Sequence, residues 1–600
     1  MDGFAFDNAT AKCQTLKTCR DTAGVIGRDD GLCGSSGPCG YPGQRACQNF
    51  PSCVAPASFD SGSAKCQDAS TCPSITQLGR NDGLCFIGVG GPCGGPGYRA
   101  CGTTPSCLPN LNFDGGTLNS GLPSCQPNKT ACAPNTGPGS NDVTFFVATD
   151  LHFGKDTLSS DSRAKHVALM NSFGTSGTPW PNTYTSRGTS SAFGAYAGRN
   201  NPLSVPRGVV TTGDITHYGQ PQELGSFRAF YEMGNGYPGS IQFPVYVGLG
   251  NHDVDGTCSQ PIPPSSCAER MFKYVEERMK GCGGVTDFDP GSRSYSWDWG
   301  QVHLVQLHKW AGDTIYGGAS DNNNKPPATH ADGLQWLTDN LRNTVGTSGR
   351  PVILFQHYGW DPFSLGITNN NSPWWSTANQ NTFLNIIKDY NVVAIFSGHG
   401  HLSNSGLYSV QVTDSSGKKK TIWNFSGTTG GEGVPQSPAA DPTSNPNGSF
   451  FAVHITPSFM DVGEYEWSPN SGGALVLKQG GANCSRMVTG VDVTANVKLT
   501  WQGFKFDSKA GRFIQSVGIT NTGSVPLRGP LSIVVDALSS NATLANATGK
   551  VDCAPLANSY VDVQVPGDIL APGQSTSGVL QFTSSNNQAI QYVTRVFGTF

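Results

Sequence analysis

Six runs of apolar residues, rich in β-branched and aromatic side chains, recur through the middle of this 600-residue chain. Each run is bounded by polar or glycine-containing turns, which is typical of strands buried on both faces. The runs lie at 143–150, 208–214, 243–251, 302–308, 351–357 and 392–399. Helical patterns lie between them, at 223–234, 267–281, 330–343 and 382–390. Buried strands that alternate with helices predict a layered α/β domain.

The pattern changes after about residue 404, where short strands follow one another without helices. The segments KKTIWNFSG, SFFAVHIT and MDVGEYEW are expected to complete the α/β domain, whose predicted span is 141–480. Residues 488–600 show alternating strands separated by Gly, Asn and Pro turns, which predicts an all-β sandwich of immunoglobulin-like or fibronectin-like size. That sandwich carries no catalytic constellation, so a folding or spacing role is favoured over carbohydrate binding or adhesion.

Residues 1–140 have a different composition, because 14 of the 19 cysteines precede residue 133. CQTLKTC recurs as CQDASTC, and GRDDGLC recurs as GRNDGLC, which defines tandem units at about 13–65 and 66–124. Modules with so little apolar content are held by disulfides rather than by a core. Each unit carries six cysteines, which allow 15 disulfide pairings, so the connectivity within a unit stays open. A rigid spacer and a module that binds a glycan or a surface are equal alternatives.

Charge and cysteine content limit the partners and the cellular compartment that we expect for the protein. With Lys+Arg 38 against Asp+Glu 42, the net charge of -4 provides no basic surface for dedicated nucleic-acid binding. Dense cysteine predicts an oxidising compartment, so we expect a secreted protein, extracellular or periplasmic, whose signal peptide has been removed. The chain contains no run of about 18 apolar residues, so no transmembrane segment is predicted. Peripheral membrane contact stays open.

Five of the predicted strands end on residue types that bind metal ions. Ligands of open α/β sheets bind at the carboxyl ends of strands. Carboxylates and imidazoles suit zinc, manganese or iron, and the donors are too many for one tetrahedral ion. A carboxylate shared between two sets of ligands can bridge a pair of ions. The strand-end residues are Asp150, His152, Asp214, Asn251, His252, Asp253, His357, His399 and His401.

The ordered motifs ATDLH, TTGD, GNHD, the strand-end QH and SGHGH resemble those of the calcineurin-like metallophosphoesterase superfamily, over about residues 143–470. The resemblance implies a four-layer α/β fold around a β-sandwich core, with a dinuclear metal centre that Asp214 bridges. Zinc, manganese or iron would fill it, with calcium and magnesium as alternatives. The implied ligands are Asp150, His152, Asp214 and His401 for one ion, and Asp214, Asn251, His357 and His399 for the other.

The resemblance also implies roles around the phosphoryl group. His252 would contact a phosphoryl oxygen and protonate the leaving group with Asn251 beside it, and Asp253 would orient their loop. Purple acid phosphatases are similar, but they place a tyrosine where this chain has His217. His217 and His152 therefore argue against a tyrosinate-bound ferric centre. His217 is a candidate for a substrate or supporting contact, with a surface-loop histidine as the equal alternative.

An aromatic segment follows the fourth motif, and its side chains are candidates for a substrate wall or for packing beneath the loop. Tyr358 and Trp360 are the candidates for contact with the substrate, and Phe363, Trp374 and Trp375 lie further along. The stretch HYGWD also resembles metallophosphoesterases of bacteria and amoebae that cleave phosphoinositides. A phosphodiesterase of the phospholipase C type is therefore an alternative function.

Together these features predict a secreted phosphoester hydrolase in which a metal-bridging hydroxide attacks an extracellular phosphomonoester or phosphodiester. The expected partner is a small phosphate ester or a lipid headgroup, and the flanking domains are candidates for glycan or surface binding. A surface-binding protein with a residual enzyme core is the alternative from another class. The intact set of ligand residues favours the enzyme.

Overall fold

The computed structural model describes short strands within residues 1–130 and most of residues 141–600. Beyond residue 141 the longer gaps are 154–159, 174–182, 187–188, 193–203, 256–263, 317–327, 368–372, 401–405, 428–448, 468–474, 479–485 and 552–557. Two compact units are present: residues 1–130 with 220–240, and residues 131–219 with 241–600. No helix of the described residues is long and apolar enough to span a bilayer.

The first unit repeats one hairpin three times, which follows the repeats in its sequence. Within each hairpin a phenylalanine of the first strand is paired with a cysteine of the second, as Phe6 with Cys13, Phe59 with Cys66, and Phe113 with Cys125. The hairpin strands are β1 (Phe4–Asp7), β2 (Lys12–Thr15), β3 (Ala57–Asp60), β4 (Lys65–Asp68), β8 (Leu111–Asp114) and β9 (Ser124–Pro127). The unit also holds β5 (Gln77–Gly79), β6 (Cys85–Ile87), β7 (Pro92–Cys93) and α3 (Pro221–Tyr231). The predicted disulfides of this region stay predictions.

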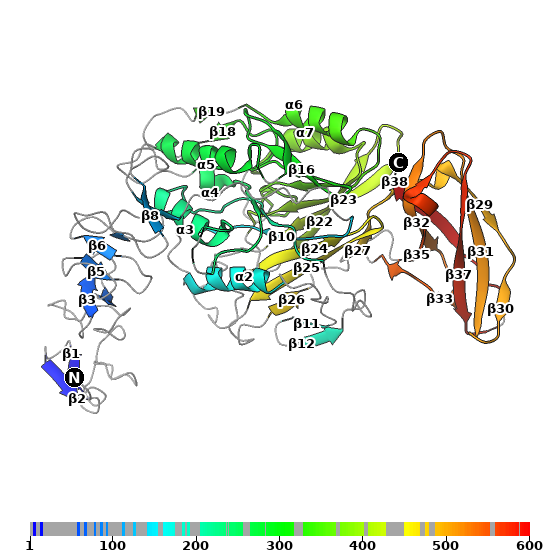
Figure 1. Ribbon diagram of the computed structural model, residues 1–600, viewed down its shortest axis with the longest axis horizontal. Coiled ribbons are helices and arrows are strands. Elements are labelled where there is room, and N and C mark those ends of the chain that lie inside the picture. Colours follow the sequence, from blue (N-terminus) through cyan, green and yellow to red (C-terminus); the bar gives the residue numbers. More distant parts are fainter. Residues whose placement is uncertain are drawn as a thin grey trace. The chain divides into compact units, whose positions relative to one another are not determined.

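The α/β domain of the second unit contains two mixed seven-stranded sheets (Figure 1). In the first sheet β27 pairs with β25, and the other strands follow the order β14-β13-β10-β24-β25-β26. These strands are β10 (Val143–Ala148), β13 (Val209–Thr211), β14 (Val245–Tyr246), β24 (Ser449–Ile455), β25 (Phe459–Trp467), β26 (Leu475–Lys478) and β27 (Arg486–Val488). The parallel neighbours β10, β13 and β14 all end at one edge, because each pair is parallel and in register.

The second sheet has the order β15-β16-β17-β20-β21-β23-β22. Its strands are β15 (Val285–Phe288), β16 (Tyr295–Trp299), β17 (Val302–Gln306), β20 (Val352–Phe355), β21 (Val392–Ser397), β22 (Gly406–Thr413) and β23 (Lys419–Ser426). β17, β20, β21 and β23 are parallel. Small hairpins elsewhere in the domain are β11 (Thr183–Ser186) with β12 (Thr189–Ala192), and β18 (Ile315–Tyr316) with β19 (Ala328–Thr329).

The two sheets pack face to face through aromatic side chains. Phe145 of β10 lies 5.4 Å from the Trp299 ring and 6.2 Å from the Phe355 ring of the second sheet. The next residue, Phe146, points to the other face and lies 5.3 Å from Phe173, just after α2. Successive strand side chains alternate between faces, so both faces of β10 are buried, as its continuous apolar run predicts.

Helices cover the outer faces, which produces a helix–sheet–sheet–helix arrangement (Figure 1). They are α2 (Ser160–Ser172), α4 (Asn251–Val254), α5 (Pro264–Met279), α6 (Leu334–Asn340), a π-helical turn η2 (Leu341–Val345) and α7 (Thr377–Ile387). Leu337, Phe383 and Ile387 of these helices share one core with Leu354 and Ile395 of the second sheet. Ser376 caps α7, since its hydroxyl accepts a hydrogen bond from the Asn379 amide at 3.2 Å. The predicted α/β fold is confirmed, and both of its sheets are mixed.

Several boundaries differ from the sequence predictions. The strand predicted at 208–214 ends at Thr211, because Gly213 and Asp214 adopt positive φ values that no strand can hold. The strand predicted at 243–251 is hydrogen-bonded only over Val245–Tyr246. Helix α2 and strands β15, β16 and β22 were not predicted. The α2 sequence has almost no amphipathic pattern, so periodicity could not show it.

The C-terminal region is strand-rich and contains two antiparallel sheets. One sheet has β28 (Val491–Asp492), β32 (Leu527–Asp536), β34 (Gly549–Lys550), β35 (Ser559–Val563), β36 (Ile569–Leu570) and β38 (Val593–Thr599). The other has β29 (Val497–Trp501), β30 (Lys505–Asp507), β31 (Arg512–Asn521), β33 (Ala542–Leu544) and β37 (Ser575–Ser584), and the 3₁₀ turns are η4 (Thr494–Asn496) and η5 (Pro566–Asp568). Val517 and Ile519 of the second sheet share an aliphatic core with Leu531 and Val596 of the first.

Candidate metal centre

The strand-end residues of the α/β domain converge at the carboxyl edge of its parallel strands. Asp150 follows β10, Asp214 follows β13, Asn251 begins α4, His357 follows β20 and His399 follows β21. These side chains are buried. Residues far apart in the sequence therefore meet because parallel strands end at the same edge.

One group of donors surrounds His152. Its Nε2 atom lies 3.9 Å from Asp150 Oδ1 and 3.6 Å from Asp214 Oδ2. The carboxylate of Asp150 is held by the His399 amide, 3.1 Å from each oxygen, and by the hydroxyl of Thr149. Thr149 was not singled out from the sequence, because a threonine before an aspartate carries no distinctive signal. The fourth predicted ligand of this group, His401, lies outside the described residues.

A second group of donors surrounds His357. Its Nε2 atom lies 3.1 Å from Asp214 Oδ2 and 3.0 Å from Asn251 Oδ1. Asp214, His357 and His399 each offer a ligand atom within 4.8 Å of the others. Asp214 thus belongs to both groups, and the resemblance implies that it bridges them.

The two oxygens of Asp214 have different surroundings. Oδ1 accepts a hydrogen bond from the His252 amide at 2.8 Å. Oδ2 is buried without a hydrogen bond of ordinary geometry among the described residues, and it lies between the imidazoles of His152 and His357. A buried carboxylate oxygen that only imidazole nitrogens approach is suited to a divalent ion, which would replace the missing donors. The residues present therefore fit a metal centre.

The contact between Asp214 and His357 shifts the pKa values of both side chains. Burial opposes the ionisation of Asp214, but the charges of His357, His252 and His152 outweigh it and hold the pKa of its carboxyl well below the usual range. Burial also opposes the charge of His357, but the Asp214 carboxylate raises the pKa of His357 to about 9. In the metal-free protein the Asp214 carboxylate is therefore ionised, which is the form that binds a metal ion.

The backbone of the site is in an unusual conformation. Left-handed φ values for non-glycine residues cost free energy, and they cluster where function over-determines the structure. Here they occur at four of the predicted metal ligands, at 51° for Asp150, 41° for His152, 49° for Asp214 and 71° for His399. The strand ends bend sharply at these residues, which turns their side chains toward one another.

Two glycines of the motifs allow close approach rather than flexibility. A Cβ atom on Gly250 would lie 2.2 Å from Asp214 Oδ1, and one on Gly398 would lie 1.8 Å from Thr149 Oγ1. Both contacts are far shorter than van der Waals separation, so no side chain fits at either position. The glycines of GNHD and GHGH are therefore part of the packing around the carboxylates.

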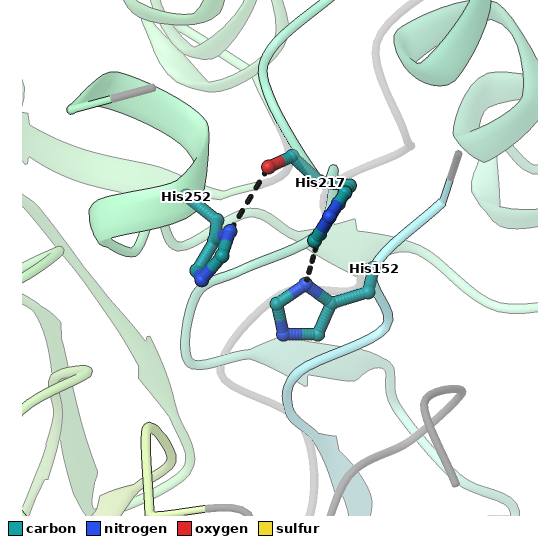
Figure 2. Close-up of side chains that lie close together, drawn as sticks. All are labelled: His152, His217 and His252. Atoms are coloured by element: carbon teal, nitrogen blue, oxygen red, sulfur yellow. Dashed lines mark hydrogen bonds between the residues drawn. The ribbon is translucent and has the colours of Figure 1, made fainter. Parts of the chain in front are cut away.

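Three histidines face one another beside the first group (Figure 2). His252 Nδ1 lies 3.0 Å from the carbonyl oxygen of His217, so that nitrogen carries the proton and donates it. The rings of His217 and His252 stack at 5.0 Å with an interplanar angle of 16°. His217 Nδ1 also lies 3.3 Å from His152 Nδ1, in a hydrogen bond between the two rings. The structure thus brings His217 to the site.

Asp253 connects the loop of Asn251 and His252 to the loop after Asp214. Its carboxylate accepts hydrogen bonds from the amides of Gly250 at 2.8 Å, Ile215 at 3.2 Å and Thr216 at 2.8 Å, and from Thr216 Oγ1 at 2.6 Å. Burial, reinforced by the nearby Asp214 carboxylate, raises the pKa of Asp253 to about 7. Thr216 was not singled out from the sequence, although it follows the TTGD motif closely.

The aromatic candidates after His357 separate into two sets. Tyr358 is buried, and its ring lies 4.8 Å from the His399 ring. Trp360, in contrast, packs into the core at 4.8 Å from Trp375 and 6.0 Å from Phe383. Its amide binds the Asn424 side chain at 2.8 Å. The interpretation of Trp360 as a substrate contact is therefore corrected, because its ring contributes to the packing beneath the loop.

Comparison with known proteins agrees with this geometry. Residues 143–403 match the family model of calcineurin-like phosphoesterases, and this part of the chain is a calcineurin-like phosphoesterase domain. The resemblance stated from the motifs is thereby confirmed, and the family indicates phosphoester hydrolysis with metal ions. No curated protein matches the chain.

Solved structures that match the chain include a purple acid phosphatase from seeds of yellow lupin, Lupinus luteus, at 10% sequence identity and a TM-score of 0.34. That match covers 62% of this chain and 57% of the lupin chain, little more than half of its length. A Vps29 variant from Entamoeba histolytica matches at 11% identity and a TM-score of 0.22, over 58% of this chain and 99% of that one. Vps29 from Cryptosporidium parvum matches at 11% identity and a TM-score of 0.23, over 58% of this chain and 98% of that one.

Proposed function

We propose that residues 143–403 hydrolyse phosphoesters with the help of two bound divalent ions. The observation that carries this proposal is the position of Asp214 Oδ2, 3.6 Å from His152 Nε2 and 3.1 Å from His357 Nε2. One carboxylate oxygen between two sets of donors is what a shared ligand requires. Asp150, His152 and Asp214 would hold one ion, and Asp214, Asn251, His357 and His399 the other.

The ions would be transition or alkaline-earth metals. Mixed carboxylate and imidazole donors suit zinc, manganese or iron, with calcium and magnesium as alternatives. Bound divalent ions lower the pKa of water and neutralise charge on phosphoryl oxygens. His401 is proposed to complete the first group because of its place in the GHGH motif.

The residues around the ions would orient the ester and move a proton. The His217 carbonyl fixes the proton of His252 on Nδ1, so Nε2 is the ring nitrogen that can hold or release a proton toward a leaving-group oxygen. The amide of His252 donates to Asp214 Oδ1, which connects the position of this ring to the shared carboxylate. The side chain of Asn251, beside His357, would contact both the metal and the phosphoryl group.

The substrate is proposed to be an extracellular phosphomonoester or phosphodiester. The support for an extracellular site is the cysteine content, since 14 of 19 cysteines fall before residue 133 in repeated units. Secretion is tested by expressing the gene in its own host and measuring the protein in the medium and in the cell fraction.

The function is tested by turnover of chromogenic esters. The full chain loaded with manganese or zinc is expected to hydrolyse 4-nitrophenyl phosphate or bis(4-nitrophenyl) phosphate. His252→Ala is expected to lower kcat by about 10²–10⁴-fold, the range for loss of a general acid. Its metal content should stay unchanged, because the backbone amide that donates to Asp214 Oδ1 is retained in the variant. Absence of turnover of both esters with each of the ions named above contradicts the function, and unchanged kcat in His252→Ala contradicts the role of His252.

A further inference from the structure

Three aromatic rings surround His399 on the side of the loop that follows His357. The centroid of the His399 ring lies 4.4 Å from Trp374, 4.8 Å from Tyr358 and 5.0 Å from Phe363. The Trp374 and His399 rings meet edge to face, at 84°. A proposed metal ligand thus has an apolar wall beside it, which the mechanism above does not use.

Hydrogen bonds fix the backbone of two residues of this wall, Phe363 and Trp374. The Asp361 carboxylate accepts from the amides of Phe363 and Ser364, both at 3.0 Å, and from the Ser364 hydroxyl at 2.6 Å. The Ser364 carbonyl in turn accepts from the Trp374 amide at 3.0 Å. The backbones of Phe363 and Trp374 are therefore positioned before any ligand arrives, which lowers the entropic cost of binding.

Two adjacent tryptophans in this loop have opposite surroundings. Trp375 is 1% exposed, packs against Trp310 and Trp360, and donates its indole N–H to the Gly359 carbonyl at 3.2 Å. Trp374 is 46% exposed. Trp375 thus anchors the loop in the core, whereas about half of the Trp374 side chain stays accessible to a ligand. Ligand sites are lined largely by aromatic and other apolar side chains, and the Trp374 ring lies 6.2 Å from Phe363 and 5.8 Å from Tyr358.

We propose that Trp374 and Phe363 form an apolar subsite for the alcohol part of the phosphoester, so that the enzyme prefers esters of aromatic or other apolar alcohols. This inference rests on the proposed function, since His399 connects the subsite to the reacting group. A ring or alkyl group bound there would cover the exposed part of Trp374 and gain apolar burial and aromatic contact. A small polar alcohol would gain neither.

The test compares two ligands with the same phosphonate group and different substituents. Phenylphosphonate and methylphosphonate are titrated calorimetrically into the manganese-loaded full chain, so no turnover is needed. We expect wild type to bind phenylphosphonate about tenfold more tightly, a difference of about 1.4 kcal/mol. Trp374→Ala should remove most of that preference, and Trp374→Phe should retain most of it. Trp501→Ala is the control, because Trp501 is also exposed, at 39%, but lies in the C-terminal sandwich.

The outcomes separate the subsite from the catalytic proposal. Equal binding of the two phosphonates by wild type, no binding of either, or an unchanged preference in Trp374→Ala overturns the subsite even if esters are hydrolysed. A preference that depends on Trp374, in a protein that hydrolyses no phosphoester, supports the subsite and overturns the proposed function. Thermal unfolding of each variant shows whether it is folded. If Trp374→Ala does not fold, Phe363→Ala decides instead, because it removes the other ring of the subsite and should also lower the preference.

Discussion

The metal-centre edge of the α/β domain and the interior of the C-terminal sandwich treat buried polar groups differently. In the sandwich, Asn521 is fully buried, and its side chain donates to the carbonyls of Val525 and Leu570, both at 2.8 Å, and accepts from the Gly523 amide at 2.9 Å. At the metal-centre edge, Asp214 is equally buried, yet among the described residues Oδ2 has no hydrogen bond of ordinary geometry and lies 3.6 Å from His152 Nε2 and 3.1 Å from His357 Nε2. The Asn521 side chain is thus fully hydrogen-bonded within the protein, whereas Asp214 Oδ2 lies among metal-ligand side chains and is positioned to bind an ion.

Backbone strain separates the same two regions. Non-glycine residues with left-handed φ in the sandwich are Ala537 and Asp568, and both lie on exposed turns. In the α/β domain such residues include Asp150 and Asp214, which are fully buried. Strain at an exposed turn is relieved by local adjustment, whereas strain in a packed interior persists only when neighbouring contacts hold it. The buried strain is therefore part of what positions the carboxylates.

The strongest test of this contrast is a pair of substitutions with opposite consequences. Asp214→Asn keeps the shape of the side chain but removes the charge that both groups of donors share. We expect kcat/KM to fall by at least about a hundredfold, with little change in the unfolding temperature of the metal-free protein. Asn521→Ala leaves two carbonyls and an amide unpaired and should lower stability by about 1–3 kcal/mol per group without changing kcat/KM. Loss of activity in both variants, or in neither, would contradict the assignment of Asp214 to the metal centre and of Asn521 to a structural role.

Removal of the metal is expected to destabilise the α/β domain but not the C-terminal sandwich. At a free ion concentration about 100 times the dissociation constant, binding stabilises a fold by about 2.7 kcal/mol. Scanning calorimetry with and without a chelator should therefore lower the transition of the α/β domain and leave that of the sandwich in place. A shift of the sandwich transition alone is the result that contradicts metal binding at the strand ends.

Asp253 tests whether the supporting hydrogen bonds matter for activity. Asn in its place cannot accept all four of the bonds that the carboxylate now accepts. We expect Asp253→Asn to lower kcat/KM by about 10–100-fold, as for other groups that orient metal ligands. Asp289→Asn is the matched control, because Asp289 also binds two amides and a hydroxyl, in the turn between β15 and β16. An equal loss in both variants would show a general effect on folding.

The sequence predicts most of the ligand positions, because each lies at the end of a local apolar run. It could not predict which residues of a loop pack into the core and which lie beside the metal centre. Trp360 and Trp375 face the core while Trp374 stays exposed, yet all three lie in one Gly- and Asn-rich segment without periodicity. The fit of Gly398 against Thr149 was also beyond reach, since it joins residues about 250 positions apart.

His217 tests the part of the site that the sequence left undecided. His217→Ala removes the ring that stacks on His252 and the nitrogen that meets His152 Nδ1, while the backbone carbonyl that binds His252 remains. We expect about a tenfold loss in kcat/KM, with weaker metal affinity because His152 is less firmly oriented. His217→Asn should recover part of both, since its amide reaches the position of Nδ1. If His217 were only a surface-loop residue, metal affinity and kcat/KM would be the same in wild type, His217→Ala and His217→Asn.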